Sequence, residues 1–320
     1  MKNTRLFALL LAVLLLAGCA ADTQSAQEAH SRTVFAMDTV MNLTAYGKRG
    51  EDALGAAVRE IYRLDGYLAR GVESSAVYAC NHGEAADGEL QSLLAVADAI
   101  DKATDGAFDP YLGAVLDLWG FGSGAGAHHV PTDAELADAG RLLDLGGIAK
   151  GYAGQRVCET LRENGVSSAV IDLGGDVALL GGKPDGSDWH IAVKDPAHTT
   201  EFLGVLASSG NCYVATSGVY ERYFEQNGVR YHHILDPRTG FPADKGLVSA
   251  TVICESGVWA DALATAVCVL GTDDALALRR ALADTTPFDL ILVTEDDRVL
   301  YTCGAFTPAT YNGYTYEQVS

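Results

Sequence analysis

A short segment dense in reactive side chains runs from Tyr231 to Gly240 and reads YHHILDPRTG. It follows an apolar, β-prone run, and its Asp-Pro and Thr-Gly pairs predict a turn at the end of a strand. Histidine can transfer protons near neutral pH, so His232 or His233 could act as a general base. Adjacent strand residues point to opposite faces, so only one of the two should face a site. The same residues could instead form a half-exposed strand pair followed by an ordinary turn.

A second segment, Asp144 to Tyr152, reads DLGGIAKGY and leads into a helix expected over residues 153–163. Gly146 and Gly147 would let a ligand approach the backbone closely. The free N–H groups at a helix start favour an anionic ligand, and Lys150 adds a full positive charge there. The alternative is a plain connection from strand to helix with a solvated lysine.

A third segment is the apolar helix expected over residues 257–270, which contains Asp261 and Thr265. Residues four apart lie on one helix face, about 5–6 Å between Cβ atoms. A carboxylate in apolar surroundings is costly unless it is paired or bound to a metal. Carboxylate, hydroxyl and carbonyl oxygens suit magnesium. Alternatively, Thr265 could merely hydrogen-bond the carbonyl of Asp261.

Two further strand ends carry polar side chains. Residues 170–181 predict a hairpin that turns at Gly174 and Gly175, where Asp172 and Asp176 could be site residues. Turn chemistry would explain Asp176 equally well. The hydroxyls of the Thr-Ser-Gly segment at residues 216–218 also fall at the end of a strand.

The N-terminus combines two positive charges, an apolar stretch over residues 6–17 and a Gly-Cys pair ending at Cys19. This pattern predicts a secretory signal, because the apolar stretch is shorter than the roughly 20 residues of a spanning helix. The sequence before Cys19 matches a bacterial lipobox, so we expect a signal peptide over residues 1–18 and lipidation of Cys19. An ordinary signal with an incidental cysteine is the alternative. Residues 19–32 should form a flexible tether, and residues 33–320 the folded domain.

Charge and cysteine content exclude several classes of protein. The formal net charge is −20 and would become −22 once the signal is removed. A chain this acidic should not bind nucleic acid or anionic lipid through bulk electrostatics, so any phosphate site must be built locally. Six cysteines follow Cys19, and none forms a CxxC pair that would indicate zinc or redox chemistry.

The elements that would position these segments mix helices and strands without strict alternation, which predicts an α+β fold. We expect helices over residues 51–68, 89–103, 153–163, 257–270 and 273–282, and a short helix after a capping box of Thr132 and Glu135. We expect strands over residues 33–46, with a bend near 37–39, and over 189–193, 202–206, 212–216, 229–235 and 247–254. A terminal hairpin is expected over residues 288–302, and a loop over 70–81.

Together these segments resemble the ApbE family of FAD:protein FMN transferases. The matching pieces keep the family's order over residues 37–265, and they are Met37-Asp38-Thr39, Asp105–Pro110, Leu118–Phe121, Asp144–Tyr152, Thr216–Gly218, His233–Gly240 and Ala260–Ala266. The resemblance implies mixed, largely antiparallel sheets with flanking helices. It also implies a flavin cleft between two closely packed halves.

The resemblance implies a magnesium-dependent reaction that transfers FMN from FAD to a threonine hydroxyl of a target flavoprotein and releases AMP. His233 would be the catalytic histidine. Magnesium would be held by Asp261, Thr265 and the backbone carbonyl of Gly147. Met37 would touch the flavin ring or the adenine. The other implied FAD contacts are Ala107, Phe108, Asp109, Asp144, Lys150 and Leu235.

The resemblance also implies partners. The acceptors would be subunits of the sodium-pumping NADH:quinone reductase or of Rnf-type complexes. The lipobox before Cys19 separately predicts that the protein is exported and lipid-anchored on the outer face of the cell membrane. Three alternatives stay open: an FAD pyrophosphatase that yields FMN and AMP, an FAD-binding lipoprotein without chemistry, and a structural or solute-binding lipoprotein.

Overall fold

A nine-stranded sheet forms the centre of the computed structural model, which describes residues 28–122, 126–198, 200–310 and 313–320. The strand order is β1-β2-β3-β4-β7-β10-β11-β12-β14, and every neighbouring pair is antiparallel except β12 and β14. The strands span Ala29–Ala36, Thr39–Tyr46, Ala169–Asp172, Val177–Leu180, Cys212–Gly218, Leu247–Cys254, Phe288–Thr294, Arg298–Tyr301 and Thr315–Gln318, in that spatial order.

The first hairpin corrects two expectations. The run from Thr33 to Tyr46 is not one bent strand, because Met37 and Asp38 take φ values of 50° and 59° and reverse the chain. Strand β1 also begins at Ala29, so residues 29–32 pair with β2 rather than belonging to the tether. Apolar periodicity could not reveal this pairing, because the outer face is polar there and a Ser31–Thr44 hydroxyl pair bridges the strands at 2.9 Å.

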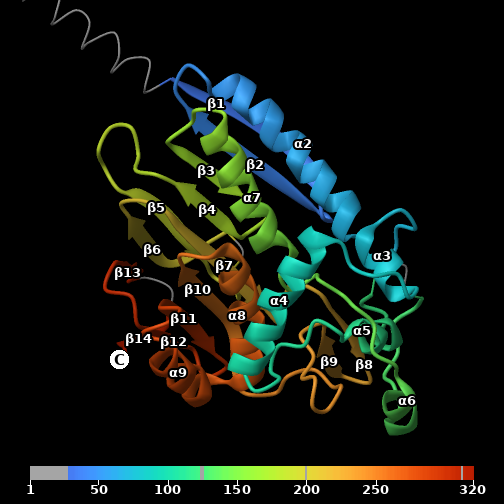
Figure 1. Ribbon diagram of the computed structural model, residues 1–320. Coiled ribbons are helices and arrows are strands. Elements are labelled where there is room, and N and C mark those ends of the chain that lie inside the picture. The colour runs from blue at the N-terminus through green and yellow to red at the C-terminus, as the bar shows by residue number, and fades with distance from the viewer. Residues whose placement is uncertain (1–27, 123–125, 199, 311–312) are drawn as a thin grey trace, which may run out of the picture.

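Helices cover one face of the sheet (Figure 1). Helix α2 packs on β1 and β2, α7 on β4, and α8 on β7 and β10. The long helices are α2 (Gly50–Leu68), α4 (Gly88–Ala103), α7 (Ala149–Glu163), α8 (Gly257–Leu270) and α9 (Thr272–Ala281). Helices α7 and α8 cross where Gly151 meets Gly257, and a Cβ at Gly151 would clash with the carbonyl oxygen of Gly257. Glycine therefore allows the two backbones to touch.

The opposite face is covered by a three-stranded sheet of order β13-β6-β5. These strands span Phe306–Pro308, Phe202–Ser208 and Trp189–Lys194. Trp189 and Leu206 pack there against Val214 and Val293 of the central sheet. Burying such side chains on both faces stabilises the central strands, each contributing about 1.5–3 kcal/mol.

Short elements gather at one end of the molecule (Figure 1). They are α3 (Ala76–Asn81), α5 (Gly113–Trp119), α6 (Asp133–Asp138), β8 (Tyr223–Gln226) and β9 (Val229–His232). Strands β8 and β9 form an antiparallel hairpin. An aromatic cluster of Trp119, Phe121, Phe224, Tyr231 and Phe241 joins that hairpin to α5.

The α+β class with largely antiparallel sheets and flanking helices is confirmed, and the flavin cleft between two halves stays a prediction. The loop expected over residues 70–81 ends in helix α3, whose first turn is capped by Ser75 accepting from the Tyr78 N–H at 2.9 Å. The capping box of Thr132 and Glu135 is present. Among the described residues, no helix combines the length and apolarity that crossing a bilayer requires.

Candidate active site

The N-terminal end of helix α7 carries a partly buried ion pair. The helix begins at Ala149, four residues earlier than expected, so Lys150 lies in its first turn. The Lys150 Nζ lies 2.5 Å from Oδ2 of Asp176, a residue only 4% exposed. The other Asp176 oxygen accepts the Thr216 N–H at 3.0 Å. Lys150 is therefore not a solvated lysine on a plain connection.

The Asp176 side chain pairs with Lys150 and does not stabilise the turn in which it lies. In the turn between β3 and β4, Asp172 accepts the N–H groups of Gly174 and Gly175 at 3.0 and 3.1 Å. Asp172 is thus the residue whose side chain stabilises this turn. The Asp176 carboxylate instead reaches away from the turn to Lys150 and to strand β7.

The three residues expected to hold a metal lie together beside this pair. Asp261 is 4% exposed, and its Oδ2 accepts the Gly151 N–H at 2.8 Å. The Thr265 hydroxyl lies 3.2 Å from that of Ser217 at the end of β7. Gly147 faces Thr265, because a Cβ built on Gly147 would stand 3.8 Å from the Thr265 hydroxyl. A carboxylate, a hydroxyl and a backbone carbonyl are hard oxygen donors, so this set fits magnesium.

Burial and neighbouring charges together shift the pKa values of Lys150 and Asp261. Burial alone would lower the pKa of Lys150, but the carboxylates of Asp176 and Asp261 raise it overall. Burial raises the pKa of Asp261, and the nearby Asp176 charge raises it further. Two carboxylates and one ammonium leave the cluster short of positive charge. A divalent cation would supply that charge and favour ionised Asp261.

His233 follows strand β9 and is set up as a neutral base. Its Nδ1 lies 3.2 Å from the carbonyl oxygen of Arg222. A carbonyl only accepts hydrogen bonds, so Nδ1 carries the proton and Nε2 keeps a free lone pair. Burial and the Arg222 charge lower the pKa of His233 to about 4. The positive charge of Lys150 adds a smaller lowering.

His232 has a different environment. It is 8% exposed, its Nε2 donates to the Ala243 carbonyl at 3.1 Å, and its Nδ1 has no hydrogen-bond partner among the described residues. The side chain is thus committed to the interior next to the turn. This geometry favours His233 as the base.

The turn after His233 is locked by its own side chains. Arg238 donates to both carboxylate oxygens of Asp236, at 2.8 Å each. The indole N–H of Trp119 donates to the Gly240 carbonyl at 2.7 Å. Leu235 is buried against the aromatic cluster that contains Trp119. These contacts fix the turn that follows His233.

The remaining residues expected to bind FAD fall into two groups. Phe108 is buried, and its ring lies against Gly147 at the metal-type site. Ala107 is buried beside it. Met37 lies in the first hairpin turn, where its N–H donates to Asp65 at 3.0 Å. That turn abuts the Asp172–Asp176 turn, since a Cβ on Gly174 would clash with Thr39.

Asp109 and Asp144 are engaged by arginines. Arg141 binds Asp109 through two hydrogen bonds of 3.0 Å. Arg70 donates to Asp144 at 2.9 Å and holds Asp117 through two further bonds of 2.7 Å. Arg70 comes from the segment expected to be a loop, and nothing in its sequence context points to this role. Asp176 and Ser217 also join the site, and only their place at strand ends indicated it.

Ligand-type side chains also gather in the loop between β5 and β6, where donor atoms of Asp195, His198 and Glu201 lie within 4.8 Å of one another. Asp195 accepts the N–H groups of Ala197 and His198, at 2.8 and 3.2 Å, and the Tyr314 hydroxyl at 3.0 Å. These bonds close the loop, so we assign this group a structural role.

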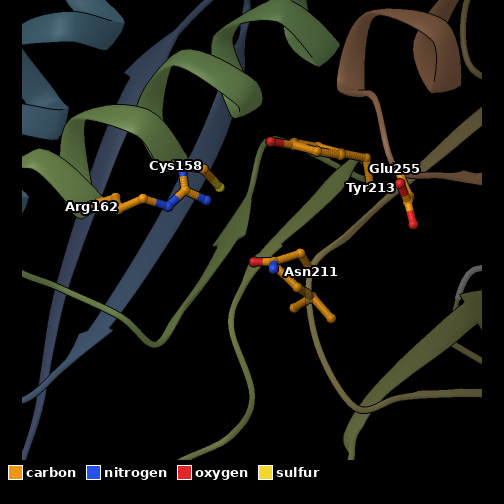
Figure 2. A pocket seen from close by; sticks show the side chains of 6 residues that line it. Cys158, Arg162, Asn211, Tyr213 and Glu255 are labelled. Atoms are coloured by element: carbon orange, nitrogen blue, oxygen red, sulfur yellow. The ribbon is translucent and has the colours of Figure 1, made fainter.

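A separate cavity of about 310 Å³ lies at the other end of α7 (Figure 2). It is lined by Cys158, Arg162, Leu179, Asn211, Tyr213 and Glu255. Arg162 follows Lys150 by twelve residues, or about 18 Å of helix, so this cavity is distinct from the lysine site. Burial raises the pKa of Cys158 to about 11, which leaves its thiol protonated and weakly nucleophilic.

The site brings hard oxygen donors and a lysine to the start of a helix, a set that would suit a divalent cation and an anionic substrate. The ApbE family model matches residues 37–287, so the chain belongs to the ApbE family, and its assignment as a transferase is confirmed. A relative from Treponema pallidum (strain Nichols), named FAD:protein FMN transferase, is 33% identical over 86% of this chain and 87% of its own length. A Vibrio cholerae relative with the same name is 36% identical over 68% of this chain and 72% of its own.

Solved structures of ApbE proteins have a similar fold. The crystal structure of the ApbE protein of Thermotoga maritima superposes with a TM-score of 0.77 at 31% identity, covering 88% of this chain and 97% of that one. The flavin transferase ApbE from Vibrio cholerae gives a TM-score of 0.73 at 29% identity, covering 84% and 95%.

Proposed function

We propose that this protein transfers FMN from FAD to a threonine hydroxyl of a partner protein and releases AMP, with magnesium required. The observation that carries the proposal is the convergence at the start of α7. Lys150 pairs there with Asp176, Asp261 is held by the Gly151 N–H, and Gly147 faces Thr265, while the Lys150 charge acts on the pKa of His233. The names of the Treponema and Vibrio relatives support the same reaction.

Magnesium would be held by the Asp261 carboxylate, the Thr265 hydroxyl and the Gly147 carbonyl. When bound, it would neutralise the pyrophosphate and stabilise the negative charge that develops in the transition state. Lys150 adds a fixed positive charge at the same helix end. The chain is strongly acidic, so these local charges are what would draw a pyrophosphate to this site.

His233 would act on the acceptor. Its Nε2 takes the proton of the threonine hydroxyl as the oxygen attacks the phosphorus on the FMN side of the pyrophosphate. The bond from that phosphorus to the bridging oxygen breaks, and AMP leaves with the bonding electrons. Burial and the Arg222 charge lower the pKa of His233 to about 4, so its imidazole is neutral at physiological pH. The negative charge of a bound pyrophosphate would raise that pKa toward the range suited to a general base.

Incubation of the protein with FAD, magnesium and a threonine-containing acceptor domain tests the proposal. Intact-mass spectrometry should show an acceptor heavier by one FMN, and chelation of magnesium should abolish the gain. An acceptor with threonine replaced by valine is the control. Free FMN and AMP with an unmodified acceptor would favour a pyrophosphatase, and bound FAD without turnover would favour a binding protein.

We further propose that the enzyme is lipid-anchored on the outer face of the cell membrane. The signal peptide over residues 1–18 and Cys19 lie outside the described residues, so this proposal is based on the lipobox pattern alone. Exported flavoprotein subunits, such as those of the sodium-pumping NADH:quinone reductase or Rnf-type complexes, would be suitable acceptors. Cys19→Ala should move the protein from the membrane fraction to the soluble fraction, and persistent membrane retention would contradict the anchor.

A further inference from the structure

Three carboxylates compete for one ammonium at the start of α7. Asp176, Asp261 and Glu221 all act electrostatically on Lys150. Only Asp176 forms a direct ion pair with it, at 2.5 Å. The pairing is enforced, because Asp176 is itself anchored to strand β7 through the Thr216 N–H at 3.0 Å.

This choice of partner has a consequence for Asp261. The Asp261 carboxylate is held in place by the Gly151 N–H at the start of α7 rather than by the lysine side chain. An ammonium bound directly to Asp261 would occupy the position of a cation and cancel the charge that attracts one. Metal ligands need such orienting partners around them as much as they need the ligand atoms themselves.

We propose that Asp176 is a positioning residue that holds the Lys150 ammonium away from Asp261 and so keeps Asp261 available to a divalent cation. The inference depends on the proposed metal-dependent function, and it assigns a role to a carboxylate outside the expected metal ligands. Asp176 does so from the turn between β3 and β4, whose geometry Asp172 secures on its own.

Binding of Mn²⁺ to the intact protein without FAD or acceptor tests the proposal, with electron paramagnetic resonance reporting the free ion. Asp176→Asn should release Lys150 toward Asp261 and weaken Mn²⁺ binding by about tenfold. Asp188→Asn is the control, because it removes an exposed carboxylate that belongs neither to this cluster nor to the turn that carries Asp176. It should leave Mn²⁺ affinity within about twofold.

Loss of one negative charge could also weaken cation binding without any movement of Lys150. A double-mutant cycle separates the two explanations. If Lys150 is redirected, Lys150→Met should raise Mn²⁺ affinity only slightly in the unsubstituted protein but by about tenfold in the Asp176→Asn background. If Lys150→Met has the same effect in both backgrounds, the positioning role is wrong.

Folding is checked by thermal unfolding of each variant. Asp176→Glu provides a second test should the asparagine variant fail to fold, because it keeps the carboxylate and should retain Mn²⁺ affinity within about threefold. An unsubstituted protein that binds no Mn²⁺ would overturn the positioning role together with the metal site. If the two substitutions are coupled in Mn²⁺ binding but the unsubstituted protein transfers no FMN, the positioning role stands and the proposed function is wrong.

Discussion

The two ends of helix α7 show opposite ways of placing charge. At its start, the partly exposed Lys150 is directly bonded to the buried Asp176, near Asp261. At its far end, Arg162 and Glu255 are exposed on the walls of a cavity. The Cys158 thiol, which also lines this cavity, stays protonated because burial raises its pKa to about 11. The cavity lacks the paired charges of the helix start. We expect the chemistry at the helix start, because the burial of Asp176 and Asp261 there makes each charge depend on its neighbours.

The largest effect should come from the expected metal ligand at the start of α7. Asp261→Asn keeps the shape of the side chain but removes the charge that would hold magnesium. We expect FMN transfer to fall at least about a thousandfold, since metal stabilisation contributes several kcal/mol to the transition state. Transfer rates under saturating FAD measure the effect. A variant with near-normal, magnesium-dependent transfer would place the metal elsewhere.

Replacing the base should come next. His233→Ala is expected to lower transfer by about a hundredfold or more, while FAD binding stays largely intact, because general-base catalysis contributes about 10²–10⁴ in rate. Fluorescence titration with FAD and a transfer assay on the same preparation separate the two effects. His232→Ala is the matched comparison and should act mainly on stability. Normal turnover of the His233 variant would show that this residue is not the base.

Stability should depend on the contact between the two site helices. Gly151→Ala forces a methyl group onto the Gly257 carbonyl and the Asp261 side chain. We expect a loss of about 3 kcal/mol in the free energy of unfolding, in the upper range for overpacking. Gly66→Ala in α2 is the control, because nothing lies within 4 Å of its Cβ position. Urea denaturation measures both, and equal stabilities would mean that α7 and α8 do not touch at Gly151.

The pH dependence of stability should reveal the environment of His233. Unfolded histidine binds a proton near pH 6.5, whereas His233 in the folded protein does so only near pH 4. Protons therefore favour the unfolded state as pH falls below 6.5, and the difference reaches about 2 kcal/mol at pH 5. His233→Gln should lose less stability than the unsubstituted protein between pH 7 and pH 5. Equal losses would mean that His233 titrates normally.

The smallest effect is expected at the far end of α7. Cys158→Ser should change the transfer rate by less than about twofold, because a thiol with a pKa raised to about 11 is not a nucleophile at neutral pH. The same assay as for the site variants applies. A loss comparable to that of His233→Ala would remove the contrast between the two helix ends.

Much of the fold, and the pairing of the expected metal ligands Asp261 and Thr265, can be predicted from the sequence because both depend on local patterns. The spacing of Asp261 and Thr265 on an apolar helix predicts one oxygen-bearing face, and the structure places Thr265 beside Gly147 and Asp261 against the Gly151 N–H. Asp176 and Arg70 could not be assigned in this way. Their roles depend on partners 26 and 74 residues away, Lys150 and Asp144, and no local pattern encodes such pairs. The pairing of residues 29–32 was hidden for a related reason, since a polar strand face has no apolar period.

The central claim is that one reaction at the start of α7 splits FAD and modifies a protein. The most direct measurement is the ratio of AMP released to FMN covalently bound to the acceptor, determined in the same reaction by chromatography and intact-mass spectrometry. We expect one AMP for each bound FMN, and neither product without magnesium. AMP released in excess, with no FMN on the acceptor, would contradict the claim and identify water as the true acceptor.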